Sequence, residues 1–448
     1  MLLAHVADLH LGKIFHERDL LPDQAAMLDG LLELLSRRRP AALLVAGDVY
    51  DRSIPSPEAI GLFDSFLNRA IEADPGLVIV VIPGNHDSAA RLSFGAGLFE
   101  RAGVHLRTRA EDCGRPVLVE RGGERLAVWP LPFLAPGAFG SPAPEAEADA
   151  GAPKGELEFD FGAPAEASEG EAREGEGGRG LPGLRSQSEL FAEALARIEG
   201  GLIPDSANVL LAHCFAAGGA ESESERVFSG TAERIDPGLF ERFDYAALGH
   251  LHRHQSAGTR GRYPGSPLAY SFGEAERGGG RGGGTGAAPD GGAERGGGTG
   301  AERGFLFVDV HPGGFEAELE PFEPLHAVRR IEGPFSVLSA PGALAECRGD
   351  YLEARLTDPL PVINPVDPLR LNFPYLLSVR QAAFEILASP RPAGAPVAGD
   401  SAGEPGDGRA DIAEDFRAFH REMKGVDPDE ATGLVFSALL EEARRETP

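Results

Sequence analysis

Eight residues whose side chains can bind a cation stand where short apolar stretches of this 448-residue chain end. Such stretches are typical of buried strands when glycine or a turn residue follows them. Parallel strands bring their carboxyl ends to one edge of an open α/β sheet, which is where such sheets bind ligands. We therefore expect a single site built from Asp8, His10, Asp48, Asn85, His86, His213, His250 and His252.

Asp48 is the centre of this expected site. It follows the apolar run 41–46 and the turn residue Gly47. A carboxylate there costs several kcal/mol unless a cation or a hydrogen-bond network compensates it. A lone Gly-Asp pair is more often a capped turn, and a lone histidine is more often a structural group. Eight such groups at one sheet edge outweigh these interpretations.

The mixture of imidazole nitrogens with carboxylate and amide oxygens suits a borderline divalent ion such as Mn²⁺, Fe²⁺ or Zn²⁺, and it lacks the thiolates of a structural zinc site. Two such ions about 3.5 to 4 Å apart can stabilise both the attacking and the leaving oxygen of a phosphoryl displacement. Because two ions can share one carboxylate, Asp48 is the natural bridge between them.

The elements that must position these residues alternate between strand and helix, which predicts βαβ units and a mainly parallel sheet. In an extended segment after a strand at 2–7, Asp8 and His10 would point the same way, whereas His5 would face the core. Further strands are expected at 41–46, 77–82, 117–120, 126–133, 208–211, 245–248, 305–310, 317–320 and 351–356, and helices at 24–38, 58–72, 189–198, 367–371, 412–423 and 429–444.

The chain carries 42 basic and 70 acidic residues, and this net charge of -28, taken alone, argues against a nucleic-acid partner. Much of the excess is local, because residues 145–176 hold eleven acidic and two basic side chains. Three cysteines without a CxxC pair suit a reducing cytosol. No signal sequence or spanning apolar run is evident, so we expect a cytoplasmic protein with no membrane partner.

Composition also divides the chain into parts. A stretch rich in Ala, Gly, Pro and Glu predicts a disordered acidic insertion, and a glycine-rich stretch predicts a flexible loop, with an RGG-type nucleic-acid contact as the weaker alternative. The expected parts are a catalytic domain at 1–276 with the insertion at about 137–183, the flexible loop at 277–304, a small α+β domain at 305–388, a linker at 389–408 and a helical segment at 409–448.

The motifs DLH, GDVYD, GNHD and GHLH, with a single histidine between the last two, together resemble those of the calcineurin-like metallophosphoesterases. Within that superfamily the chain is similar to the SbcD family, as the stretches HVADLHLGK, GDVYDRSIPSPEA, IPGNHDSAARLSFG and YPGSPLAYSFGEAERG indicate. The resemblance covers nearly the whole chain apart from the acidic insertion and the glycine-rich loop. It implies a four-layer α/β/β/α sandwich in which residues 305–388 form a capping domain.

The same resemblance implies a role for each residue of the expected site. His86 would contact the scissile phosphate and protonate the leaving oxygen without binding metal. Asp87 would hold the GNHD turn or orient a neighbouring group, with simple turn stabilisation as an equal alternative. One metal ion is expected at Asp8, His10, Asp48 and His252, and the second at Asp48, Asn85, His213 and His250.

In function, the resemblance implies a two-metal, Mn²⁺-dependent nuclease that acts as a 3′–5′ double-strand exonuclease and single-strand endonuclease in DNA repair, recombination and replication. The implied partners are DNA, an SbcC-like coiled-coil ATPase that binds the helices of 409–448, and a second copy of the chain, which would form a homodimer within a heterotetramer. A phosphatase or phosphodiesterase for nucleotides or phosphoproteins would share the metal site. A non-catalytic subunit that tethers DNA ends is a more distant alternative.

Overall fold

The computed structural model describes residues 1–135, 138–139, 186–219, 234–275, 303–384 and 421. Met1–Ala388 form one compact unit and Ser389–Pro448 a second. Nearly all of the expected acidic insertion, the glycine-rich loop up to residue 302, the linker at 389–408 and, apart from Arg421, the helical segment at 409–448 lie outside the described residues.

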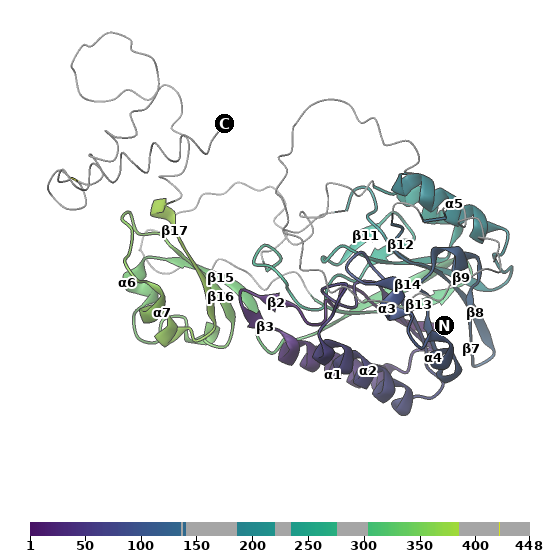
Figure 1. Ribbon diagram of the computed structural model, residues 1–448, viewed down its shortest axis with the longest axis horizontal. Helices are drawn as coiled ribbons and strands as arrows, with labels where there is room; N and C mark the ends of the chain where they lie inside the picture. The colour runs from purple at the N-terminus through teal and green to yellow at the C-terminus, as the bar shows by residue number, and fades with distance from the viewer. Residues whose placement is uncertain (136–137, 140–185, 220–233, 276–302, 385–420, 422–448) are drawn as a thin grey trace, which may run out of the picture. The chain divides into compact units, whose positions relative to one another are not determined.

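Within the described residues, the first sheet has six strands in the order β14-β13-β1-β4-β5-β6 (Figure 1). The strands β1, β4, β5 and β6 run parallel, whereas β13 pairs antiparallel with β1 and β14 with β13. The parallel strands read as continuous apolar runs because both of their faces are buried. The bounds are β1 (Leu2–Val6), β4 (Ala42–Ala46), β5 (Val78–Ile82), β6 (Val104–Leu106), β13 (Gly304–His311) and β14 (Gly314–Pro321).

The second sheet, in the same described part of the chain, also has six strands, in the order β11-β12-β10-β9-β8-β7. Its interior strands β8, β9, β10 and β12 run parallel, and an antiparallel strand lies at each edge. The bounds are β7 (Val117–Arg121), β8 (Glu124–Leu131), β9 (Ala207–His213), β10 (Tyr245–Gly249), β11 (Gln255–Ala257) and β12 (Gly261–Tyr263).

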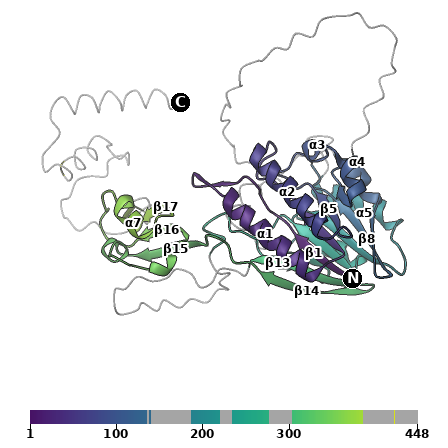
Figure 2. The same cartoon turned by 90° about the horizontal axis from the view of Figure 1, so that it is seen from below.

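The two sheets pack face to face through an apolar core that includes Leu44 of β4 and Leu211 of β9. The helices α1 (Leu21–Arg38) and α2 (Pro57–Ala73) lie side by side over the first sheet, as Figure 2 shows, and α5 (Gln187–Glu199) covers the second. The fold is therefore the α/β/β/α sandwich that the resemblance implied.

The three long helices form where their apolar spacing predicted them, because each buries one apolar stripe. Helix α1 begins three residues earlier than expected, with Pro22 in its first turn. Ser56 caps α2 by accepting the backbone N–H of Ala59 at 3.2 Å. Ser186 and Glu189 form a capping box that begins α5.

The expected capping domain begins too early. Its first two strands, β13 and β14, pair with β1 and extend the first sheet, because the apolar residues Phe305 and Phe307 join the core beneath α1 and α2. A separate three-stranded parallel sheet begins only at Val328 and has an apolar core of its own. Its elements are β15 (Val328–Gly333), α6 (Phe335–Leu338), η4 (Ala345–Cys347), β16 (Tyr351–Leu356), α7 (Val366–Asn372) and β17 (Leu376–Gln381).

Sequence patterns missed β15 and β17, because both are only partly buried and rich in arginine. The helical turn near Asp367 is confirmed as α7, although Asp367 lies in its first turn rather than at its cap. In the described part of the chain, no helix combines the length and the apolar character needed to cross a bilayer. The remaining short elements are β2 (Ile14–Phe15), β3 (Arg18–Asp19), α3 (Ala89–Leu92), α4 (Ala96–Phe99), η1 (Glu100–Ala102), η2 (Ala110–Gly114) and η3 (Pro237–Arg242).

Candidate metal centre

The expected site residues follow the carboxyl ends of β1, β4, β5, β9 and β10, and their side chains come together there. Asp8, His10 and Asp48 have left-handed backbones, with φ of 55°, 44° and 49°, and φ of His250 is 112°. The expectation that Asp8 and His10 point the same way because they are extended is therefore wrong. Such conformations cost about 1–3 kcal/mol each and are typical of functional sites.

Glycines of the motifs allow the strand ends to approach one another closely. A Cβ atom at Gly249 would overlap the carbonyl oxygen of Ala46, and one at Gly84 would overlap the Asp48 carboxylate. The two sheets can therefore meet backbone to backbone at this edge, which brings the polar residues of β10 within reach of those of β1 and β4.

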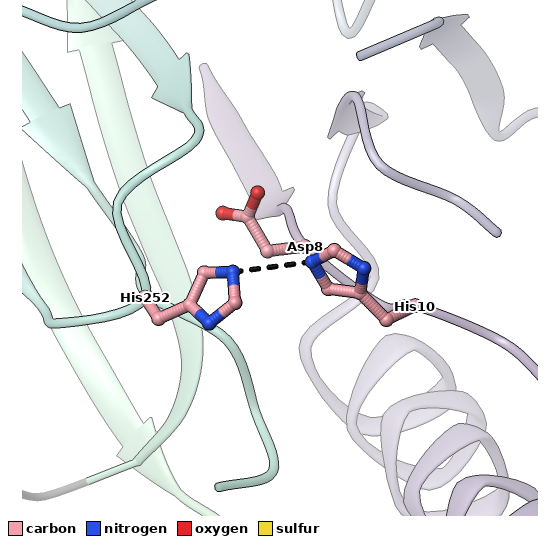
Figure 3. Close-up of side chains that lie close together, drawn as sticks. All are labelled: Asp8, His10 and His252. Carbon is pink, nitrogen blue, oxygen red and sulfur yellow. Dashed lines mark hydrogen bonds between the residues drawn. The ribbon is translucent and has the colours of Figure 1, made fainter. Parts of the chain in front are cut away.

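Asp8, His10 and His252 form the first cluster, and Figure 3 shows the two imidazoles facing each other beside the Asp8 carboxylate. The Nε2 atoms of His10 and His252 lie 3.1 Å apart. Neighbouring ligands of one ion take about this separation, because metal–nitrogen bonds are about 2.0–2.1 Å long. This donor set fits one divalent cation.

Asn85, His213 and His250 form the second cluster. The Asn85 Oδ1 atom lies 3.0 Å from Nε2 of His213 and 3.1 Å from Nδ1 of His250. Asp48 stands between the clusters, with its Oδ2 atom 3.8 Å from Nε2 of His10 and 3.5 Å from Nε2 of His213. One carboxylate is therefore within reach of both donor sets.

Hydrogen bonds fix the tautomers of two imidazoles. His213 donates Nδ1–H to the carbonyl oxygen of Ala46 at 2.8 Å, so its lone pair is on Nε2, the atom that faces Asn85 and Asp48. His252 directs Nδ1 at the Glu274 carboxylate at 3.1 Å, which leaves the Nε2 lone pair facing His10. These are the forms in which neutral histidine binds a metal ion.

Burial controls the charge of the site. It lowers the pKa of His10 and of His213, and it lowers the pKa of His250 to about 3, so these imidazoles are neutral at pH 7. Burial alone would raise the pKa of Asp48. The imidazoles of His213 and His86 and the backbone N–H of His86 nevertheless hold that pKa below its usual value. The buried carboxylate is therefore ionised and ready to bind a cation.

His86 lies at the edge of both clusters. Its Nδ1–H donates to the backbone carbonyl of Asp51 at 2.9 Å, and its ring centroid lies 4.8 Å from that of His10. The adjacent Asp87 carboxylate accepts the backbone N–H groups of Val49, Tyr50 and Gly84 at 2.9–3.0 Å. Asp87 thus holds the GNHD turn against the GDVYD turn, which is one of the two roles considered for it.

All eight sequence-predicted residues meet at this edge of the sandwich, but three supporting residues escaped the sequence patterns. Lys13 binds the Asp51 carboxylate at 2.7 Å, and Asp51 lies within the GDVYD motif. Glu274 is fully buried beside His252. An acidic residue directly after an apolar run, as in YSFGE, is the signal that could have drawn attention to Glu274.

Comparison with known proteins supports the same assignment. The family model of the calcineurin-like phosphoesterases matches residues 1–136. The SbcD subunit of the SbcCD nuclease of Staphylococcus epidermidis is 26% identical over 388 residues, which cover 86% of each chain. The corresponding protein of Staphylococcus saprophyticus is 26% identical over 391 residues, which cover 87% of each chain.

Among solved structures, the crystal structure of TT1561 of Thermus thermophilus matches 59% of this chain and 89% of its own, at 12% identity and a TM-score of 0.31, which is too low for an argument about fold. The family model covers the strand ends that carry Asp8, Asp48 and Asn85. The two relatives extend the similarity to most of the remaining chain. The chain therefore belongs to the SbcD family of the calcineurin-like phosphoesterases.

Proposed function

We propose that this protein is a metal-dependent DNA nuclease that hydrolyses phosphodiesters at the strand-end site. The observation that carries this proposal is the position of Asp48, a 2% exposed carboxylate within 4 Å of an imidazole nitrogen from each of two donor clusters. A pair of divalent ions sharing one carboxylate stabilises both the attacking and the leaving oxygen of an in-line phosphoryl displacement.

The protein's own side chains divide the work. Asp8, His10, Asp48 and His252 would hold one ion, and Asp48, Asn85, His213 and His250 the other. His86 would bind a phosphate oxygen and give a proton to the leaving oxygen, since its Nδ1 is held by the Asp51 carbonyl and its ring faces His10.

The identity of the substrate rests on the relatives, both of which are named as nuclease subunits. We propose duplex DNA ends as the substrate of a 3′–5′ exonuclease and single-stranded DNA as that of an endonuclease, with Mn²⁺ as the metal. The relatives' name further suggests an SbcC-like ATPase partner, bound through residues 409–448, and a homodimer of this chain within a heterotetramer. Chromosomal DNA would be met in the cytoplasm, where we expect the protein to act.

The test is degradation of linear duplex DNA, labelled at either the 5′ or the 3′ end, with Mn²⁺ and with or without the ATPase. Asp48→Asn is expected to reduce cleavage by about 10³-fold, because the variant loses the shared charge. The control is Asp64→Asn, which changes an exposed carboxylate on α2 and should leave cleavage unchanged.

Three outcomes would contradict the proposal. Unchanged cleavage by Asp48→Asn would exclude a shared carboxylate. Turnover of a small aryl phosphodiester that DNA does not inhibit would favour a phosphoesterase for small substrates. Salt-sensitive DNA binding without hydrolysis would favour a tethering protein.

A further inference from the structure

We propose that Glu274 is a positioning residue for one metal ion, because it fixes the ring orientation and tautomer of His252. It would act together with Arg303, which holds Glu274 in place. The inference rests on the proposed function, since it takes His252 as a metal ligand, and it goes beyond that function by assigning a role to a buried ion pair outside the eight motif residues.

Glu274 is 0% exposed, so its charge must be balanced within the protein. One carboxylate oxygen, Oε1, lies 3.1 Å from Nδ1 of His252. The other, Oε2, accepts the backbone N–H of Tyr270 at 3.0 Å and a guanidinium N–H of Arg303 at 3.1 Å. The two oxygens thus have different tasks, one toward the histidine and one toward the scaffold.

Arg303 ties this pair to the loop that carries the metal ligand. One of its terminal nitrogens donates to the carbonyl oxygens of Ser266 at 2.8 Å and Leu268 at 3.0 Å, and it lies 3.3 Å from the carbonyl oxygen of His252 itself. The guanidinium therefore holds both the backbone of His252 and the carboxylate that orients its ring. A five-donor planar group is suited to this task in a way that lysine is not.

The chemistry of this arrangement concerns the second nitrogen of a ligand histidine. A carboxylate that accepts Nδ1–H keeps the Nε2 lone pair directed at the metal and strengthens it as a ligand, and loss of such a carboxylate typically weakens metal binding by about 10- to 100-fold. In this protein Nε2 of His252 faces Nε2 of His10. Glu274 should consequently affect the ion at Asp8, His10 and His252 more than the ion at Asn85, His213 and His250.

The ion pair also joins the two ends of a long insertion. Glu274 lies next to the last residue described before the gap at 276–302, and Arg303 is the first residue described after it. Their contact means that the chain leaves and re-enters the sandwich beside His252. A clamp at this point keeps the ligand loop fixed whatever the length of the intervening segment.

The experiment measures Mn²⁺ binding to the full-length chain by titration calorimetry, together with the electron paramagnetic resonance signal of the coupled ion pair. We expect two ions in the wild type. Glu274→Ala should weaken the binding of one ion by about 100-fold, and Glu274→Gln, which keeps an acceptor oxygen, by about 10-fold. Both should diminish the coupled signal and leave the other ion bound.

Glu353 provides a matched control, because it is a buried glutamate that pairs with Arg330 at 2.5 Å and Arg380 at 3.0 Å in the three-stranded sheet. Glu353→Gln should bind two ions as the wild type does. Equal losses in Glu274→Gln and Glu353→Gln, or wild-type affinity for both ions in Glu274→Gln, would overturn this inference alone. A wild-type protein that binds no Mn²⁺ would overturn the proposed function and the inference with it.

Discussion

At the scale of single residues, His86 can be separated from the proposed metal ligands by experiment. Its Nδ1 is held by a backbone carbonyl, and its role as proton donor requires no bond to metal. We predict that His86→Gln lowers DNA cleavage by about 10²- to 10⁴-fold while both Mn²⁺ ions remain bound. Metal content and cleavage are measured on the same sample. Loss of an ion would make His86 a ligand instead.

His5 gives a prediction about pH. This histidine is fully buried in β1, with Nδ1 at 2.8 Å from the Tyr245 hydroxyl, and burial lowers its pKa to about 3. Below about pH 6.5 the unfolded chain takes up a proton that the folded state refuses, so the stability present above that pH is lost as pH falls toward the folded-state pKa.

We expect His5→Gln to remove this dependence, because glutamine does not titrate. Between about pH 7 and pH 5 the free energy of unfolding of the wild type should fall by about 2 kcal/mol more than that of the variant. Urea unfolding of the metal-free proteins at several pH values measures the difference, and the site histidines contribute equally to both. Parallel pH profiles would show that His5 titrates normally in the folded state.

At the scale of elements, Asp87 joins the turns that follow β4 and β5. Its two oxygens accept three backbone N–H groups, those of Val49, Tyr50 and Gly84. Asp87→Ala should lower the free energy of unfolding by about 3 kcal/mol, because three donors lose a charged acceptor. It should also weaken Mn²⁺ binding, since Asp48 and Asn85 lie in the two turns.

Asp87→Asn serves as the control for this prediction. It retains one acceptor oxygen, and we expect it to lose less stability than Asp87→Ala in the same urea titration. Equal and small effects of both substitutions would mean that the turns are held by the strands alone.

The long elements and the site residues could be predicted because each depends on local patterns. Leu28, Leu31 and Leu35 mark the buried stripe of α1, and the run 78–82 marks a strand buried on both faces. The partners of β13 and β14 could not be predicted in this way, since β13 pairs with a strand at the opposite end of the unit. The same limit hid Glu274, whose role becomes visible only beside His252.

At the scale of the whole molecule, the net charge of -28 was a poor guide to partners, because it includes the acidic stretch at 145–176, which lies outside the described residues. The convergence of the site depends instead on two sheets whose strands end at the same edge. Asp8 and Asp48 come from one sheet and His213 and His250 from the other. The packing of the sheets is therefore part of the metal site.

A last prediction concerns how the three-stranded sheet is joined to α1. Asp23 of α1 is 2% exposed and accepts hydrogen bonds at 2.9 Å from the Tyr351 hydroxyl and from Nδ1 of His326. Tyr351→Phe leaves this buried carboxylate with one donor fewer. We expect it to lower the free energy of unfolding by about 1–3 kcal/mol and to speed proteolysis between β14 and β15.

Tyr375→Phe is the matched control, because the Tyr375 ring also packs on His326, with centroids 4.6 Å apart, but no hydrogen bond to Asp23 is found for it among the described residues. Urea unfolding and limited proteolysis of the two variants compare the same chemical change with and without loss of the buried contact. If Tyr351→Phe is no less stable than Tyr375→Phe, apolar packing rather than the Asp23 hydrogen bonds joins the sheet to α1.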